Sequence, residues 1–408
     1  MRFTGYSYPW DVVDSPGFTD RAAELGVDEV AVALSYHSAR AATPWSLGRT
    51  ALHARYAALY RPIREDAWLG ARLRPSAPDW LVWTDAGGEA VRMLAKAGVP
   101  AAGWVVLTHN SRLGIAYPEL AVQNCFGEPY QWALCPSSAE VREFAATLAA
   151  EAVRDLELTS VVLEACGQLG ALHQCHHEKT DAVWSPATAR LLSVCCCAAC
   201  AQRWTAAGAN PAEVRSRLRN GVHRLIRDGD LSAAGTPADP PADLPEQLAS
   251  LLLACRQAGT DQLRADVVAA CRRELGDGVR IVLHGSVDPW ATGALPALTP
   301  AAARNVDGLD SVVLPCWQPG PATVSSVREA RALLPSRVGV GAYVTAVGAS
   351  SLPDPAGYVT ELARAGADRL HLYHLGLAGP ARWGDMLATA AGARTMHPGG
   401  HHDKGHAL

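Results

Sequence analysis

The sequence predicts an α/β protein whose strands and helices alternate into a closed (β/α)₈ barrel. One local pattern recurs: a helix-like run ends in glycine, and an apolar run follows a few residues later. Gly26 precedes the apolar run 30–34, and Gly366 precedes the run 370–373. Glycine commonly ends helices in the left-handed conformation, and a continuous apolar run is typical of a parallel strand covered on both faces. The second observation is the number of such runs, which is eight.

The eight expected strands cover the whole chain, which favours a barrel over the alternative of an open, doubly wound sheet. The clearest helix follows Ser137-Ser-Ala-Glu140, which has the pattern of a capping box, and Val141, Phe144 and Leu148 continue it at helical spacing. In chain order, the expected strands are 3–8, 29–35, 103–109, 159–164, 280–285, 310–315, 338–343 and 369–374.

Two gaps between the expected strands are long. We predict a single barrel over 1–395, with an insertion over 168–275 after the fourth strand that contains a cysteine cluster. Within it, the Pro/Ala/Asp-rich stretch 236–245 has too few apolar residues to pack and is expected to be a mobile loop. A second excursion, 38–100, follows the second strand, and the tail 396–408 is expected to be disordered. Both insertions leave from the strand ends at which barrel enzymes hold their active sites.

The composition is that of a globular protein with a large core. Lys+Arg number 36 against 40 for Asp+Glu, the net charge is −4, and 49% of the residues are hydrophobic. With no basic block, nucleic acid is not an expected partner. No apolar run is long enough for a membrane span, and the N-terminal segment lacks the pattern of a signal peptide. We therefore expect a cytoplasmic protein that acts on a small molecule. The oligomeric state stays open, a homo-oligomer included.

Glu164 is the strongest candidate for a catalytic residue. It ends the apolar run 159–164, where burial would raise the pKa of its carboxyl, as a general acid near neutral pH requires. The alternative is a salt bridge at the barrel rim. Cleavage of a glycoside commonly needs a second carboxylate, roughly 5–10 Å away. Asp288 lies closest to a later strand end, ahead of Glu178 and Asp11, although Asp288 is equally suited to the turn before Pro289.

The other strand ends are rich in aromatic, imidazole and amide side chains. Flat rings beside polar groups suit a sugar, which has apolar faces and many hydroxyls; the alternative is that the aromatic rings close the barrel core. The predicted substrate-binding residues are Tyr6, Trp10, Tyr36, His37, His109, Asn110, His284, Trp317, Tyr343, Tyr373 and His374.

The cysteine cluster predicts a metal site. Cys195, Cys197 and Cys200 form a C-x-C-x-x-C pattern, and a tetrahedral zinc site takes four such ligands. A reduced, cysteine-rich helix start without an ion is the alternative. The candidates for the fourth ligand are Cys135, Cys196, Cys175, His176 and His177.

A family resemblance rests on residues 130–205. Leu134-Cys135-Pro136 opens a helix, a strand ends in Glu164, and the C-x-C-x-x-C pattern leads to Gln202-Arg-Trp204. This order resembles the glycoside hydrolase family 42 β-galactosidases, which are (β/α)₈ barrels with a structural zinc. The resemblance implies that Glu164 is the acid/base and that Cys135, Cys195, Cys197 and Cys200 bind zinc.

The chain departs from that family in two places. Leu163 precedes the acid where the family has asparagine, and the seventh expected strand, 338–343, has no acid to act as nucleophile. We therefore predict a divergent, glycoside-hydrolase-like enzyme for a small glycoside or another sugar-containing metabolite. One alternative is a metal-dependent barrel hydrolase or isomerase that uses His37, His109, His176, His284 and His374. The other is a barrel that binds a sugar without catalysis.

Overall fold

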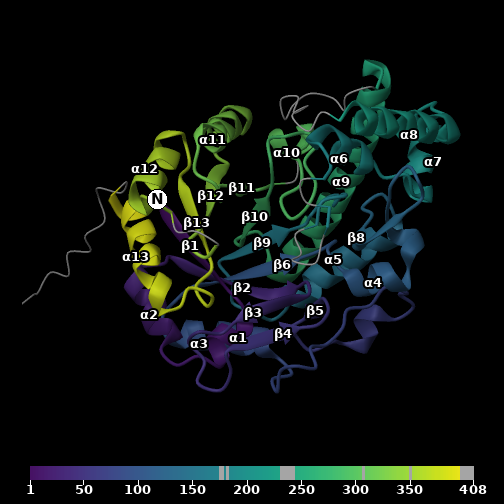
Figure 1. Cartoon of the computed structure of the whole chain (residues 1–408). Coiled ribbons are helices and arrows are strands. Elements are labelled where there is room, and N and C mark those ends of the chain that lie inside the picture. The colour runs from purple at the N-terminus through teal and green to yellow at the C-terminus, as the bar shows by residue number, and fades with distance from the viewer. Residues whose placement is uncertain (174–178, 181–182, 230–243, 306–307, 349–351, 396–408) are drawn as a thin grey trace, which may run out of the picture.

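The computed structural model shows a closed barrel of eight parallel strands surrounded by helices (Figure 1). It describes residues 1–173, 179–180, 183–229, 244–305, 308–348 and 352–395. Strand β1 pairs with both β2 and β13, so the first strand of the chain closes the ring against the last. The predicted barrel is confirmed. Its strands are β1 (Arg2–Ser7), β2 (Glu29–Tyr36), β6 (Ala101–Val106), β9 (Ser160–Glu164), β10 (Arg280–His284), β11 (Ser311–Pro315), β12 (Gly339–Thr345) and β13 (Arg369–Tyr373).

Helices follow the strands and cover the outside of the ring. Seven of them begin with proline, at a position where the missing N–H costs no hydrogen bond. The helices are α1 (Pro9–Val13), α2 (Phe18–Leu25), α3 (Ala86–Lys96), α4 (Ser111–Ala116), α5 (Ala139–Val153), α6 (Pro186–Leu192), α7 (Ala198–Ala206), α8 (Pro211–Asp228), α9 (Glu246–Leu275), α10 (Pro300–Ala303), α11 (Pro321–Leu333), α12 (Pro355–Arg364) and α13 (Pro380–Thr395), with two short 3₁₀ turns, η1 (Glu65–Trp68) and η2 (Pro118–Leu120).

Helix α5 shows how the sequence pattern becomes structure. Val141, Phe144 and Leu148 are buried on the face that packs against the barrel, as their spacing predicts. The capping residue is Ser138, one position later than the capping-box pattern suggests, and its side chain makes no cap hydrogen bond. The hydroxyl of Ser137 instead accepts a hydrogen bond from the thiol of Cys200.

Short strands and loops fill the excursion after β2 and the region before α5. Strands β3 (Ala39–Ala42) and β4 (Ala51–Ala54) form one antiparallel pair, and β7 (Ala121–Gln123) and β8 (Pro129–Leu134) form another. The two-residue strand β5 (Ala58–Leu59) pairs with the end of β2.

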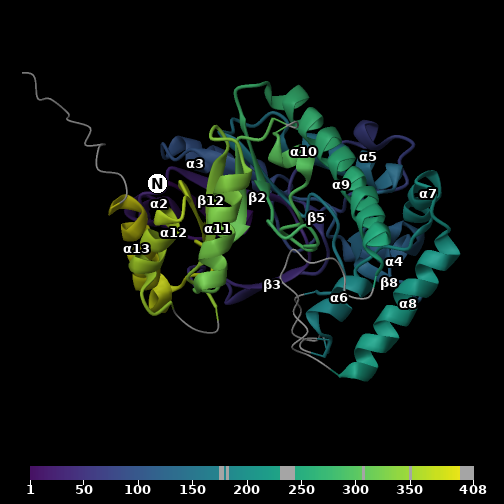
Figure 2. The ribbon, with the colours of Figure 1, turned by 90° about the horizontal axis from the view of Figure 1, so that it is seen from above.

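The long insertion after β9 divides into two parts. Helices α6, α7 and α8 lie together at one side of the barrel, as both views show (Figures 1 and 2). Helix α9, which ends the predicted insertion 168–275, packs along α5 and thus takes a place in the ring of barrel helices. Most of the loop 236–245 and all of the tail 396–408 lie outside the described residues. No helix in the described part of the chain is long and apolar enough to cross a membrane.

Arg264 on α9 holds two of the loops that follow barrel strands. Its side chain is fully buried, and it donates hydrogen bonds to the carbonyl of Cys166, after β9, at 3.0 Å and to the carbonyl of Ala297, after β10, at 2.8 Å. A buried guanidinium is costly to desolvate unless such acceptors meet it. Arg264 therefore fixes the loops next to Glu164 and His284.

We expect Arg264→Met to lower the free energy of unfolding by about 2–4 kcal/mol, because two buried carbonyls lose their donors. Urea unfolding followed by circular dichroism measures this. Arg217→Met, which removes a half-exposed arginine that pairs with Glu213 on α8, is the control and is expected to cost less than about 1 kcal/mol. Equal stability of the two variants would contradict the role of Arg264.

Candidate functional site

The carboxyl group of Glu164 lies at the carboxyl-terminal end of β9 and is nearly buried, with 5% of the residue exposed. The indole Nε1 of Trp104, on β6, donates a hydrogen bond to Oε2 at 2.8 Å. Burial raises the pKa of Glu164 to about 8, and the hydrogen bond from Trp104 offsets only part of that rise. At neutral pH the group is therefore mostly a protonated acid.

Tyrosine hydroxyls surround this acid. Tyr6, Tyr36, Tyr343 and Tyr373 come from four different strands, and burial, reinforced by the Glu164 carboxylate, raises the pKa of each. Tyr8 links two of them, since its hydroxyl lies 3.4 Å from that of Tyr36 and 3.1 Å from that of Tyr373. All of these hydroxyls are neutral hydrogen-bonding groups in the physiological pH range.

Two histidines and Tyr6 continue the polar cluster into the barrel. Nδ1 of His284 lies 3.5 Å from Oε2 of Glu164. On the opposite side of the His284 imidazole, Nε2 lies 2.8 Å from the hydroxyl of Tyr6. That hydroxyl lies 3.0 Å from Nδ1 of His371. Burial lowers the pKa of both histidines, for His371 to about 3, so both imidazoles are neutral.

A second buried carboxyl, that of Asp11, lies beside His374. Oδ2 of Asp11 accepts a hydrogen bond from the backbone N–H of Tyr8 at 3.0 Å and lies 3.7 Å from Nδ1 of His374. Burial raises the pKa of Asp11 to about 7. Gly376 packs directly on this carboxyl, because a Cβ there would come within 2.0 Å of it. The ring of Trp10 stacks on that of Tyr8, with the ring centroids 4.4 Å apart.

Asp288 has partners of its own. Nη2 of Arg190, on α6, lies 3.0 Å from one carboxylate oxygen, and the backbone N–H of Trp290 donates to the other at 2.8 Å. These contacts are those of a turn residue that also anchors the insertion. Within the described part of the chain, neither a hydrogen bond nor an ion pair joins Asp288 to Glu164.

The remaining predicted substrate-binding residues form the outer rim. The rings of His37 and His109 stack with their centroids 4.3 Å apart, and Nε2 of His109 lies 3.1 Å from Nε2 of His173. Asn110 caps α4 through the backbone N–H of Leu113, and the ring centroid of Trp317 lies 5.8 Å from that of Tyr343.

The structure brings four cysteines together in one buried cluster. Cys135 follows β8, and its sulfur lies 3.6 Å from the sulfurs of Cys195, Cys197 and Cys200. Sulfurs bound to one tetrahedral ion at 2.3 Å would be separated by roughly 3.8 Å, so this spacing fits a metal with four thiolate ligands. Among the described residues, no other group of three or more His, Cys, Asp or Glu converges in this way. The predicted histidine set does not, and its member His176 lies outside those residues.

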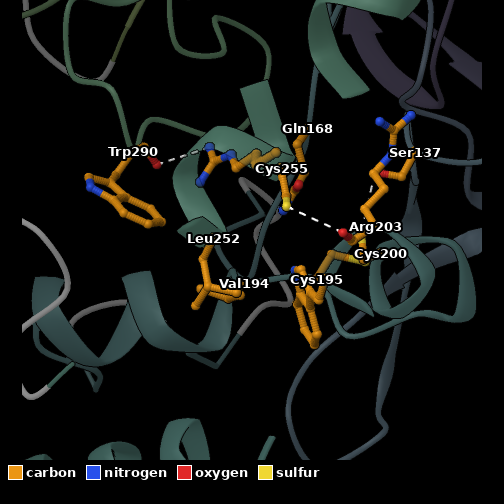
Figure 3. Close-up of a pocket in the computed structure, with 11 residues that line it drawn as sticks. Ser137, Gln168, Val194, Cys195, Cys200, Arg203, Leu252, Cys255 and Trp290 are labelled. Atoms are coloured by element: carbon orange, nitrogen blue, oxygen red, sulfur yellow. Dashed lines mark hydrogen bonds between the residues drawn. The ribbon is translucent and has the colours of Figure 1, made fainter. Parts of the chain in front are cut away.

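A small pocket lies beside the cysteine cluster (Figure 3). Cys195 and Cys200 form part of its wall, with Cys255 and Trp290 also lining it. Arg256, which is partly buried, lines it too and donates hydrogen bonds to the carbonyls of Trp290 and Ala291. The cavity volume of about 10 Å³ admits roughly one water molecule, so this pocket is no site for a sugar.

Three residues of the buried cluster were not among the predicted site residues. Trp104 and Tyr8 belong to runs of aromatic and apolar residues and are easily taken for core alone. His371 offers a signal, since it is a lone imidazole between Leu370 and Leu372 in the middle of a buried strand. Such a polar residue inside an apolar run needs a partner in the core.

Known proteins resemble this chain in three-dimensional structure only. No protein-family model matches it, and no curated protein matches it in sequence. The catalytic domain of β-amylase from Paenibacillus polymyxa is 12% identical, with a TM-score of 0.58 over 97% of this chain and 99% of that domain. α-L-Fucosidase isoenzyme 2 from Paenibacillus thiaminolyticus is also 12% identical, with a TM-score of 0.55 over 97% of this chain. This chain spans about half, 49%, of the fucosidase.

The likeness is one of fold. Both solved structures belong to glycoside hydrolases, and the shared feature is the closed parallel barrel. At 12% identity the comparison does not extend to individual residues of the site.

The raised pKa of Glu164 predicts a pH-dependent stability. Between pH 5 and 8 the unfolded chain releases this proton while the folded protein retains it. The free energy of unfolding therefore falls as the pH rises. With a shift from 4.5 to about 8, that contribution is about 3–4 kcal/mol.

Unfolding free energies of the wild type and Glu164→Gln at pH 5, 6, 7 and 8 measure it, since the difference between the two proteins removes the effects of the buried histidines and Asp11. The wild type is expected to lose stability relative to the variant across this range. Glu213→Gln, on the exposed face of α8, is the control. Parallel curves for wild type and Glu164→Gln would contradict the burial of an ionisable acid.

Proposed function

We propose that this protein is a glycoside-hydrolase-like enzyme that cleaves a small glycoside or another sugar-containing metabolite, with Glu164 as the general acid. The supporting observation is the buried carboxyl of Glu164 at the carboxyl-terminal end of β9, where burial raises its pKa. A general acid must hold its proton at working pH and release it to the leaving oxygen, and a pKa of about 8 satisfies the first requirement. The likeness in fold to glycoside hydrolases agrees with this proposal.

The surroundings of Glu164 suit a neutral, hydroxyl-rich ligand. The tyrosine hydroxyls and neutral imidazoles around it can donate and accept hydrogen bonds without attracting an ion. Oε1 of Glu164 has no hydrogen-bond partner among the described residues, whereas Oε2 is held by Trp104. In the proposed reaction, Oε1 delivers the proton.

The second catalytic group is less well defined. Asp288 was predicted for this role, and its ion pair with Arg190 instead favours a structural role in the loop after β10. The seventh barrel strand, β12, presents Tyr343 near the acid, and burial raises the pKa of its hydroxyl, which makes it a poor nucleophile. We propose that water or a group of the substrate attacks the anomeric carbon.

The second candidate function is a barrel that binds sugar without turnover. The observation that favours it is the absence, within the described residues, of a carboxylate paired with Glu164. Binding without hydrolysis in the experiment below would establish this alternative.

The acid role predicts that Glu164→Gln slows hydrolysis by about 10²–10⁴-fold for poor leaving groups and by less for good ones, because only a poor leaving group needs protonation. Nitrophenyl, phenyl and methyl glycosides of common sugars provide the series, and kcat/KM is measured for each. For the wild type, kcat/KM is expected to fall as the pH rises through about 8, since the active form of Glu164 is protonated.

Two controls complete the assay. Glu213→Gln is expected to behave as the wild type, and Asp288→Asn tests the predicted second carboxylate directly. A loss in Asp288→Asn that is as large as that in Glu164→Gln would restore Asp288 to catalysis. Equal activity of Glu164→Gln and wild type would remove Glu164 from the reaction.

We further propose that the four-cysteine cluster binds one structural zinc ion. Four protein thiolates complete a tetrahedral site and leave no open position for a substrate, which is typical of structural zinc. The bound complex would have a net charge of −2, and the partly buried cation of Arg256 beside Cys195 and Cys200 complements that charge. Zinc there would tie the loop after β8 to the insertion.

Purified protein is expected to contain one zinc per chain by elemental analysis, and Cys197→Ser is expected to lose the metal and to unfold at lower temperature. Cys196→Ser is a matched control, because the Cys196 thiol points to the carbonyl of Val194 and lies outside the cluster. Metal-free wild type from zinc-supplemented medium, or equal metal loss in both variants, would contradict the site.

A further inference from the structure

We propose that Tyr6, His284 and His371 form a chain of hydrogen bonds with one fixed direction, which turns the acidic proton of Glu164 onto Oε1. Tyr6 and His371 are then positioning residues that act on the acid through His284. The significance of this hydrogen-bond chain for catalysis rests on the proposed function of Glu164. The direction of its hydrogen bonds does not depend on that function.

This chain of hydrogen bonds crosses the inside of the barrel. His371 on β13, Tyr6 on β1 and His284 on β10 are each at most 1% exposed. The ring nitrogens of His284 and His371 approach the Tyr6 hydroxyl at 2.8 and 3.0 Å, respectively. Both distances are those of true hydrogen bonds.

The Tyr6 hydroxyl has a single proton, so its two neighbours cannot play the same role. If Tyr6 donates to His284, then His371 must donate to Tyr6, and each histidine bears its proton on Nδ1. If Tyr6 donates to His371, then His284 must donate to Tyr6, and each histidine bears its proton on Nε2. The two tautomers are therefore coupled, and the choice made at His371 decides which nitrogen of His284 bears hydrogen.

Gly341 on β12 selects the first arrangement. Nε2 of His371 and Nδ1 of His284 are both buried and make no hydrogen bond. Of these two nitrogens, only Nδ1 of His284 lies near a carboxyl oxygen among the described residues, Oε2 of Glu164 at 3.5 Å. A Cβ at Gly341 would come within 2.7 Å of Cδ2 and 3.0 Å of Nε2, so the Cδ2–Nε2 edge of the His371 ring packs against the Gly341 methylene. If Nε2 of His371 bears no proton, it can accept a weak C–H hydrogen bond from Gly341. If it bears a proton, that hydrogen would meet a hydrogen of Gly341 and have no acceptor. His371 therefore bears its proton on Nδ1.

The direction then runs from His371 to Glu164. His371 donates to Tyr6, Tyr6 donates to Nε2 of His284, and Nδ1–H of His284 faces Oε2 of Glu164 at 3.5 Å. Oε2 thus faces two N–H groups, the other being that of Trp104 at 2.8 Å. A proton on Oε2 would oppose both donors, so the acid holds its proton on Oε1, the oxygen without a partner.

The charged groups around this hydrogen-bond chain leave its two histidines and its tyrosine neutral. Arg280 and Arg369 lie near His371 and help burial to keep its pKa low. Glu29, near Tyr6, is ion-paired with Arg280 at 2.7 Å. Besides His284 on β10, the titratable groups described as acting on Glu164 from other strands are tyrosines whose pKa values are raised: Tyr6 on β1, Tyr36 on β2, Tyr343 on β12 and Tyr373 on β13.

The test reads the tautomers directly by ¹⁵N NMR of the full-length protein labelled at histidine, at neutral pH. The His284 signals are identified by their loss in His284→Gln, and those of His371 by their loss in His371→Asn. Both residues of the wild type are expected to be protonated at Nδ1 and bare at Nε2. Protonation of either one at Nε2 would overturn the proposal.

Tyr6→Phe removes only the linking hydroxyl. Without it, an N–H on Nε2 of His284 no longer forces an unpaired N–H at His371, and Nδ1 is free to accept the proton of Glu164. His284 is therefore expected to populate both tautomers, and a pure, unchanged Nδ1–H signal would contradict the coupling. Gly341→Ala, which keeps every polar group and displaces the His371 ring, is expected to have the same effect in weaker form. Tyr358→Phe removes a buried hydroxyl that donates to the carbonyl of Cys316 and makes no hydrogen bond to Tyr6, His284 or His371, and it is the control.

Kinetics then separate this inference from the proposed function. Tyr6→Phe is expected to lower kcat about tenfold and to move the alkaline limb of the pH profile upward, because Glu164 loses the N–H that stabilises its carboxylate. If no glycoside is hydrolysed by any of these proteins, the proposed function fails, while the nitrogen signals still decide the direction of the chain. If Glu164→Gln abolishes hydrolysis and wild-type His284 is protonated at Nε2, the proposed function stands and this inference falls.

Discussion

The chemistry of this barrel depends on the cost of enclosing one carboxyl group without a cation. Glu164 has a single close donor, the indole of Trp104, and no lysine or arginine pairs with it among the described residues. In such surroundings the ionised form is penalised far more than the neutral form. The tyrosines and histidines around it respond to the same penalty and remain neutral. The result is a polar interior that has hydrogen-bonding capacity and little net charge.

The cysteine cluster meets a different need. The segment between β9 and α9 is long, and its three helices lie at the side of the barrel instead of in its ring. A peripheral unit of this size has limited apolar surface with which to fix itself. Cys135 comes from the barrel side and the other three cysteines come from the insertion, so a shared ion would join the two parts at one point. Arg190 adds a second connection through Asp288.

The sequence was sufficient for the barrel, and it singled out Glu164 and the cysteine cluster, whose roles stay proposals. Strands buried on both faces are continuous apolar runs, and for that reason all eight could be located. Glu164 was recognisable because a carboxylate that ends such a run is rare. The ion pair of Asp288 with Arg190 could not be recognised in the sequence, because the two residues lie 98 positions apart and only packing brings them together. Trp104 could not be distinguished from a core residue, because an indole serves both purposes. The choice of Cys135 over the other candidates for the fourth sulfur likewise depends on the fold.

The closure of the ring by β1 and β13 also orders events during synthesis. Tyr6 is made well before His371, which lies 365 positions later, and β1 pairs with β13 along four positions. At roughly 5–20 residues per second, about 20–70 s separate the synthesis of these two strands. A nascent or truncated chain that ends before β13 exposes an unpaired edge on β1 and cannot enclose Glu164. Such a chain needs protection from aggregation, and the surroundings of Glu164 are incomplete until β13 is made.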